Sequence, residues 1–268
     1  MAKAILLPLF ESGKYKPENV FGIVGSSSSV SSALNDLPKG ARVVSTNDDS
    51  SVEVWRAPLK LLAVKPQQIG QIREHESSFQ SSAQFPKPLL ISVLAGITLQ
   101  SLKKIFPGHT CVRAVPNTPS LVSEGLTGLA WEDDITSHQK ILVRKIFEPI
   151  SEIFELPEKQ LDPFLALTSS GPAYIALMIE AMADGAVAAG LPRNLSTQLS
   201  NKTLSGTASL LRKKNLHPAE LKDMVTSPAG TTISAIRHLE LAGLRSALIE
   251  AVVLAAQRSR QLAEEGPN

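Results

Sequence analysis

The chain has 268 residues, enough for one large domain or two ordinary ones with a hydrophobic core of normal size. Its 27 Lys and Arg residues nearly balance 25 Asp and Glu residues, which excludes a protein whose work is electrostatic capture of nucleic acid or of anionic membranes. A hydrophobic share of 43% is typical of a globular protein. The single cysteine, Cys111, fits a reducing compartment, so we expect a buried thiol and a cytoplasmic protein.

Two apolar stretches have the composition of membrane-directed segments. Residues 4–10 are short, are followed by Glu11 and lack a small-residue cleavage site, so they predict the start of a helix. Residues 173–179 belong to the most hydrophobic stretch, but Glu180 and Asp184 interrupt it well before about 20 apolar residues. We therefore expect no membrane span, and we expect this helix to be buried in a large core or in a subunit interface.

The first half of the chain alternates short apolar runs with polar or amphipathic segments, a rhythm typical of βα units. Several runs hold consecutive apolar residues, which predicts strands covered on both faces, as in a parallel sheet. The expected strands are 21–25, 41–45, 59–64, 89–94 and 110–114. Helices are expected at 69–74 and 99–106, the latter capped by Thr98 or Ser101. A mixed α+β domain is the alternative.

Long helices without further strands follow from about residue 161. Ser170, Gly171 and Pro172 predict the start of the first helix, and Gly190 followed by Pro192 predicts its end. The helices expected after it run from Asn194 to about 214, from Pro218, over 231–241 and over 245–264. We place the boundary between residues 155 and 162, which gives domains of 1–157 and 158–268.

Several kinds of chemistry have no signature in the sequence. The five histidines occur in no metal-ligand spacing, and there is neither a Walker loop nor a G-x-S-x-G elbow. We therefore expect no metal site and no phosphoryl transfer.

The most distinctive motif of the helical half is the loop 226–232, TSPAGTT, which immediately precedes a helix expected to begin near Thr231. Unpaired N–H groups and the positive dipole end of a helix suit a carboxylate or phosphate, and small hydroxyl residues leave room for one. An ordinary capped turn is the alternative.

Small or polar residues also follow the expected strands, where open α/β sheets bind ligands. The strand 21–25 is followed by Ser26–Ser29 and by no Asp or Glu that would bond a ribose 2′-hydroxyl, which favours NADP over NAD. The double-proline turn 115–119 fixes Asn117 and Thr118 with their polar ends exposed. The alternatives are a serine-rich surface loop and a purely structural turn.

Six segments in this order resemble the Δ1-pyrroline-5-carboxylate reductase family, whose members make proline by reducing a cyclic imine with NAD(P)H. The resemblance extends over essentially the whole chain. The segments are 63–66 (AVKP), 113–119 (RAVPNTP), 169–174 (SSGPAY), 180–192 (EAMADGAVAAGLP), 217–223 (HPAELKD) and 226–233 (TSPAGTTI). The resemblance implies an α/β fold in which a Rossmann-like dinucleotide-binding domain precedes an all-α dimerisation domain, with substrate sites formed between subunits.

The resemblance also implies roles for single residues. The substrate pyrroline-5-carboxylate is implied to bind at Ser227, Gly230, Thr231 and Thr232, with Thr232 as the catalytic residue near the ring nitrogen. The implied cofactor is NADP, with NAD as the alternative. Its adenosine side would be held by Ser26, Ser27 and Asn47, and its nicotinamide side by Ala63, Val64, Lys65, Pro66, Ala95, Gly96, Asn117 and Thr118.

The chain departs from the family pattern at its start, because it opens at the Met-Ala that follows the family's first strand and glycine-rich phosphate loop. That strand is central in the sheet, so its absence predicts two facing strand edges without a partner. We expect the natural gene to start upstream; a truncated homologue that has lost cofactor binding is the alternative. Ser169 and Ala229 stand where the family commonly has glycine, and we expect Ala229 to require a negative φ.

The leading hypothesis is NADPH-dependent reduction of pyrroline-5-carboxylate to proline by a homodimer or larger homo-oligomer. A reductase of a related cyclic imine would use the same architecture. A β-hydroxyacid-type dehydrogenase would carry a catalytic lysine in the first long helix of the second domain, and residues 171–189 contain none. The non-enzymatic alternative is a catalytically impaired homologue that acts only as a dimeric scaffold.

Overall fold

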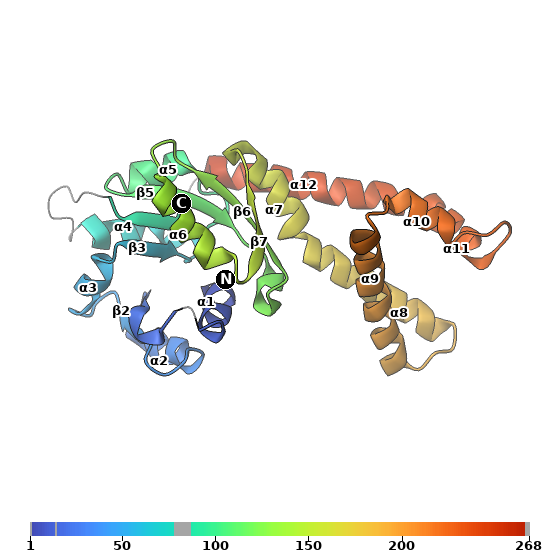
Figure 1. Ribbon diagram of the computed structural model, residues 1–268, viewed down its shortest axis with the longest axis horizontal. Helices are drawn as coiled ribbons and strands as arrows, with labels where there is room; N and C mark the ends of the chain where they lie inside the picture. The colour runs from blue at the N-terminus through green and yellow to red at the C-terminus, as the bar shows by residue number, and fades with distance from the viewer. Residues whose placement is uncertain (1, 14, 78–86, 266–268) are drawn as a thin grey trace. The chain divides into compact units, whose positions relative to one another are not determined.

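A computed structural model describes residues 2–13, 15–77 and 87–265 of the chain (Figure 1). The chain divides into two compact units. The first unit comprises residues 1–169 and 255–268, and the second comprises residues 170–254. The domain boundary that we place after residue 157 stays a prediction.

The first unit is built on parallel strands, as the consecutive apolar runs predict. β1 (Phe21–Val24) pairs in parallel with β2 (Arg42–Ser45). A larger sheet has the strand order β3-β4-β5-β6-β7. In it β3 (Leu59–Leu62), β4 (Leu89–Ser92) and β5 (Thr110–Val115) are parallel, β6 (Gly125–Trp131) runs antiparallel to β5, and β7 (Ser151–Glu155) is parallel to β6.

The sheet of the first unit is interrupted between β1 and β3. Among the described residues these two strands lie in separate sheets and do not pair with each other.

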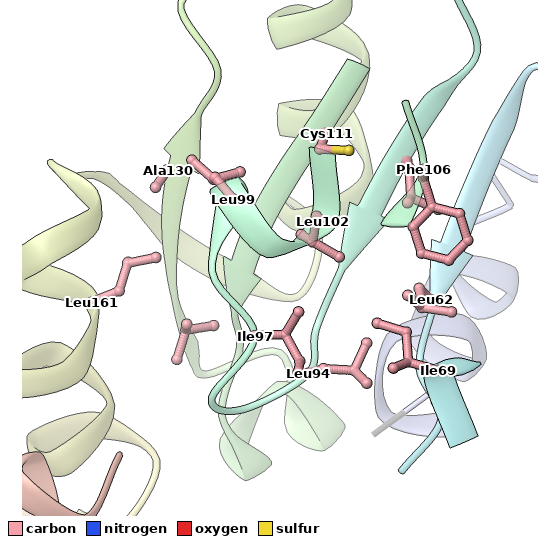
Figure 2. Close-up of a cluster of buried hydrophobic side chains, with 12 residues drawn as sticks. Leu62, Ile69, Leu94, Ile97, Leu99, Leu102, Phe106, Cys111, Ala130 and Leu161 are labelled. Carbon is pink, nitrogen blue, oxygen red and sulfur yellow. The ribbon is translucent and has the colours of Figure 1, made fainter. Parts of the chain in front are cut away.

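Successive residues of the central strands face two separate apolar clusters, because side chains alternate between the faces of a strand. Leu90 and Cys111 belong to one cluster, which α5 (Leu99–Ile105) and α7 (Leu161–Thr168) cover (Figure 2). Leu89 and Val112 belong to the other, which α1 (Ala2–Glu11) and α6 (Ser137–Phe147) cover. The predicted burial of the Cys111 thiol is confirmed.

The helices expected in the first half are present as α1, α4 (Ile69–Ser77) and α5. Thr98 caps α5, since its hydroxyl oxygen accepts from the N–H of Ser101 at 3.1 Å. The sequence patterns did not predict α2 (Ser27–Asn35), α3 (Ser51–Trp55), α6 or α7, nor the strands β6 and β7.

The second half is helical, as predicted. Its helices are α8 (Gly171–Ala188), α9 (Arg193–Lys214), α10 (Pro218–Met224), α11 (Thr231–Leu241) and α12 (Leu244–Glu265), of which α12 ends in the first unit. Gly190 adopts the expected left-handed conformation after α8, with φ +105°. The prediction that Asn194 caps the next helix is wrong, because the N–H of Ser196 already donates to the carbonyl of Pro192 and Asn194 lies inside the first turn.

α8 leaves most of its surface uncovered within this chain. Among its residues, all of them described, only Ala183 is buried, while the side chain of Leu177 is 67% exposed. Within the segment Glu158–Ala188, an 18-residue window has a mean hydropathy of 1.3, so the segment is long and apolar enough by length and composition to cross a membrane. The helix is therefore not buried in the core of this chain, and its burial in a subunit interface stays a prediction at this point.

Candidate active site

The residues predicted for the adenosine side of a cofactor follow the carboxyl ends of β1 and β2. Ser26 is the N-cap of α2, and its hydroxyl lies 3.0 Å from that of Ser28. The hydroxyl of Ser27 donates to that of the buried Ser45 at 3.4 Å, which links the ends of the two strands. Asn47 is exposed in the turn after β2. Hydroxyl groups at a helix N-terminus that has no acidic residue in its first turn suit a phosphate group.

The residues predicted for the nicotinamide side follow the carboxyl ends of β3, β4 and β5, which are neighbouring parallel strands. They therefore lie along one edge of the larger sheet. Gly96 is buried and has φ +73°, a conformation that favours glycine, whereas Ala95 and Lys65 are exposed. The full set that this edge brings together is Ala63, Val64, Lys65, Pro66, Ala95, Gly96, Asn117 and Thr118.

Asn117 differs from the other residues of this set because its side chain is buried and already bonded. Its Nδ2 donates to the carbonyl of Thr168 at 2.9 Å, and its Oδ1 accepts from the N–H of Leu126 at 2.8 Å. The expectation that the polar end of Asn117 is exposed is therefore wrong, whereas Thr118 is exposed as expected. Both hydrogen-bond partners come from elements that lie later in the chain, so no local pattern could reveal them.

The residues predicted to bind substrate form one tight loop in the second unit. The N–H of Gly230 donates to the carbonyl of Ser227 at 3.1 Å, and a Cβ atom at Gly230 would collide with the hydroxyl of Ser227. Gly230 is the N-cap of α11 and supplies no side-chain cap. The helix therefore begins at Thr231 and Thr232 with N–H groups and a positive dipole end directed at the loop, and its first turn has no acidic residue. This arrangement suits a small carboxylate.

Ala229 adopts a left-handed conformation in this loop, with φ +55°. Our expectation of a negative φ is therefore wrong. The turn from Ser227 to Gly230 imposes this conformation, although an L-residue with a Cβ atom pays roughly 1–2 kcal/mol for it. The loop keeps the shape that a glycine would adopt there.

Comparisons with known proteins identify the family of the chain. A sequence model of the family described as "Pyrroline-5-carboxylate reductase dimerisation" matches residues 158–262. Pyrroline-5-carboxylate reductase of Synechocystis sp. is 41% identical over 265 residues, which cover 99% of this chain and 96% of the relative. The enzyme of that name from Glycine max is 36% identical over 98% of this chain and 92% of its own length.

The chain belongs to the pyrroline-5-carboxylate reductase family. Among solved structures, pyrroline carboxylate reductase of Plasmodium falciparum with NADP bound superimposes with a TM-score of 0.84 at 28% identity, covering 97% of this chain and 93% of the other. The Coxiella burnetii reductase gives a TM-score of 0.82 at 30% identity, covering 98% and 94%. These findings confirm the predicted family, the Rossmann-like fold class and the oxidoreductase activity.

Family membership also explains the exposed apolar surface of α8. The region that matches the dimerisation model includes this helix and supports homo-oligomerisation of the chain. The same match covers the whole apolar segment Glu158–Ala188. The roles assigned to single cofactor and substrate residues stay predictions.

Proposed function

We propose that this chain reduces L-1-pyrroline-5-carboxylate to L-proline with NADPH, as the last step of proline biosynthesis. The single observation that carries the proposal is the loop 226–230, which delivers an uncapped helix N-terminus at Thr231 in a chain of this family. The substrate is a small carboxylic acid with one ring nitrogen, and the loop offers backbone N–H groups for the first and a hydroxyl group for the second.

The carboxylate of the substrate is bound by the N–H groups of Thr231 and Thr232, beside the hydroxyl of Ser227. Gly230 leaves this space open, because any side chain there would meet the Ser227 hydroxyl. The positive end of α11 favours the anion.

The donor groups in the first unit suit a phosphorylated dinucleotide. The serine hydroxyls at the start of α2 can donate to a 2′-phosphate, which supports NADP over NAD. The exposed Ala95 has a small side chain that leaves room for a flat ring at the edge of the larger sheet, and Gly96 supports the turn behind it in a left-handed conformation. When bound there, NADPH supplies the hydride that reduces the imine carbon.

The chain's own residues orient the substrate for this transfer. Hydride addition to a protonated imine carbon gives a neutral amine, because the electron pair of the C=N double bond moves to the nitrogen. The reaction needs positioning and exclusion of water more than a strong acid. The Thr232 hydroxyl holds the ring nitrogen, so no histidine or carboxylate is required in this role.

A direct assay of NADPH binding and oxidation on the purified chain tests the proposal. We expect NADPH to bind with a change in its fluorescence, and its absorbance to fall only after the imine is added, with one proline formed per NADPH consumed. Binding of NADPH without oxidation, or no binding at all, would instead support the impaired homologue that acts as a scaffold. Comparison of the kcat/KM values for NADPH and NADH tests the preference for the 2′-phosphate.

We further propose a homodimer as the minimal assembly and the cytoplasm as its location. The dimerisation region over residues 158–262 supports the first, and the single, buried Cys111 is consistent with the second. Sedimentation of the purified chain and imaging of a tagged copy in the native cell test the two statements separately.

A further inference from the structure

A buried network of charged groups lies beside β5 in the first unit. Arg113 is only 2% exposed, and its guanidinium donates to Glu158 Oε1 at 3.3 Å and to Asp162 Oδ1 at 3.3 Å. The hydroxyl of Ser259, in α12, donates to the same oxygen of Asp162 at 2.8 Å. Charge-assisted hydrogen bonds of this kind are strong, and removal of one member leaves the others short of a partner.

The network holds two of the predicted cofactor segments together. Glu158 Oε1 also accepts from the N–H of Leu99 at 2.7 Å, so one carboxylate binds both β5 and the start of α5. Leu99 follows Gly96 by three residues, and Arg113 precedes Asn117 by four. A shift of Glu158 would therefore move the Gly96 loop and the Asn117 turn together.

The last turns of α12 pack directly against Gly96. A Cβ atom at Gly96 would lie 3.0 Å from Leu262 Cβ and 3.1 Å from the Leu262 carbonyl carbon. Ser259 precedes Leu262 by three residues, which places both on one face of the helix. The same helix face therefore holds Asp162 through Ser259 and confines Gly96 through Leu262.

We propose that Ser259 is a positioning residue that, acting through Asp162, Arg113 and Glu158, fixes the Gly96 loop for the nicotinamide end of the cofactor. This inference rests on the proposed function. Ser259 does not touch the cofactor; its hydroxyl fixes Asp162, Asp162 and Glu158 fix Arg113, and Glu158 fixes the first turn of α5 behind the loop.

The variant Ser259→Ala tests the inference, because it removes one hydroxyl and leaves the helix and its backbone contact with Gly96 in place. We expect the Kd for NADPH, measured by fluorescence titration, to rise roughly three- to tenfold, as for the loss of one charge-assisted hydrogen bond. The KM for the imine and the size of the oligomer should stay as in the wild type. Ser196→Ala is the matched control, since Ser196 is a fully buried helical serine whose hydroxyl donates to Pro192.

A second measurement needs no cofactor. We expect amide hydrogen exchange at residues 95–99 to be faster in Ser259→Ala than in the wild type and unchanged in Ser196→Ala. A variant with lower thermal stability but wild-type NADPH affinity and wild-type exchange at these residues would show that the network is only structural, and would overturn the inference. Failure of the wild-type chain to bind NADPH would contradict the proposed function itself, and with it this role of Ser259.

Discussion

The side-chain amide of Asn117 caps the end of a helix: its Nδ2 donates to the carbonyl oxygen of Thr168, the last residue of α7, at 2.9 Å. The last carbonyl groups of a helix have no partner within it, so this bond satisfies a group that burial would otherwise penalise. The Oδ1 atom of the same side chain holds the N–H of Leu126 at the start of β6. Asn117 thus fixes the turn after β5 from inside the protein, and only its backbone is left to face a cofactor.

The first prediction is that Asn117→Ala lowers stability in the absence of any cofactor. It leaves two backbone groups without their partner, which should lower the free energy of unfolding by about 2–4 kcal/mol. Urea unfolding of the cofactor-free protein measures this. Thr118→Ala is the control, since Thr118 is exposed in the same turn, and its effect should stay within about 0.5 kcal/mol. Equal stability of the two variants would contradict the capping role.

The second prediction concerns the left-handed Ala229. Ala229→Gly should raise the free energy of unfolding by about 0.5–1 kcal/mol, because relief of the strained φ outweighs the greater flexibility of glycine in the unfolded chain. Ala235→Gly, the same substitution inside α11, should lower it by about 1 kcal/mol. Thermal unfolding of the wild type and of both variants measures these changes. If Ala229→Gly were less stable than the wild type, the left-handed conformation of Ala229 would not be strained.

The sequence predicted the elements whose signal is local. Strands β1 to β5 appear as apolar runs, and the loop before α11 appears as a cluster of small hydroxyl residues, because neither depends on distant partners. Strand β6 was missed because glycine interrupts its pattern. Gly128 leaves room for α7, since a Cβ atom there would lie 2.8 Å from Phe164 Cδ1, and this packing is visible only in the folded chain.

Some features of the candidate site could likewise be predicted from the local sequence, whereas others depend on distant residues. The positions of Ser26, Gly96 and Thr231 after strands or before helices follow from the local sequence. The burial of Asn117 does not, because Thr168 lies 51 residues away. Nor does the conformation of Ala229, which the turn imposes against the preference of the residue itself.

The third prediction tests the catalytic role of Thr232. Thr232→Ala should lower kcat roughly tenfold, because it removes one hydrogen bond to the substrate nitrogen, and should leave the oligomer intact. Thr207→Ala is the control, since the Thr207 hydroxyl is exposed on α9 and donates to a carbonyl of its own helix. Steady-state kinetics with NADPH and the imine, together with size-exclusion chromatography, measure both effects. Wild-type kinetics in Thr232→Ala would remove this residue from the mechanism.

The fourth prediction places the apolar face of α8 in the interface between subunits. Leu177 is 67% exposed in the single chain, so Leu177→Glu should not disturb the packing within one subunit. A buried charge at the interface should weaken self-association at least about tenfold. Analytical ultracentrifugation over a range of concentrations measures the shift. Leu34→Glu adds the same charge to an exposed leucine of α2 and should leave the assembly unchanged; an unchanged assembly in Leu177→Glu would place that side chain outside the interface.

The fifth prediction concerns pH. Burial raises the pKa of the Glu132 carboxyl above its ordinary value of 4.5, and the neighbouring Asp134 adds to the rise, while the Cys111 N–H and Lys103 oppose it. The folded protein therefore binds this proton more tightly than the unfolded chain does. The stability gained in this way is fully present below pH 4.5 and is lost as the pH rises through the higher pKa of the folded state.

Glu132→Gln keeps a neutral side chain at all pH values, so it should not lose this stability. We expect the melting temperature of the variant, relative to the wild type, to rise as the pH increases from 4.5 and then to stay constant above the folded pKa of Glu132. Differential scanning fluorimetry from acidic to neutral pH measures this difference. If the difference in melting temperature between the variant and the wild type were the same at every pH, the Glu132 carboxyl would ionise as readily in the folded protein as in the unfolded chain.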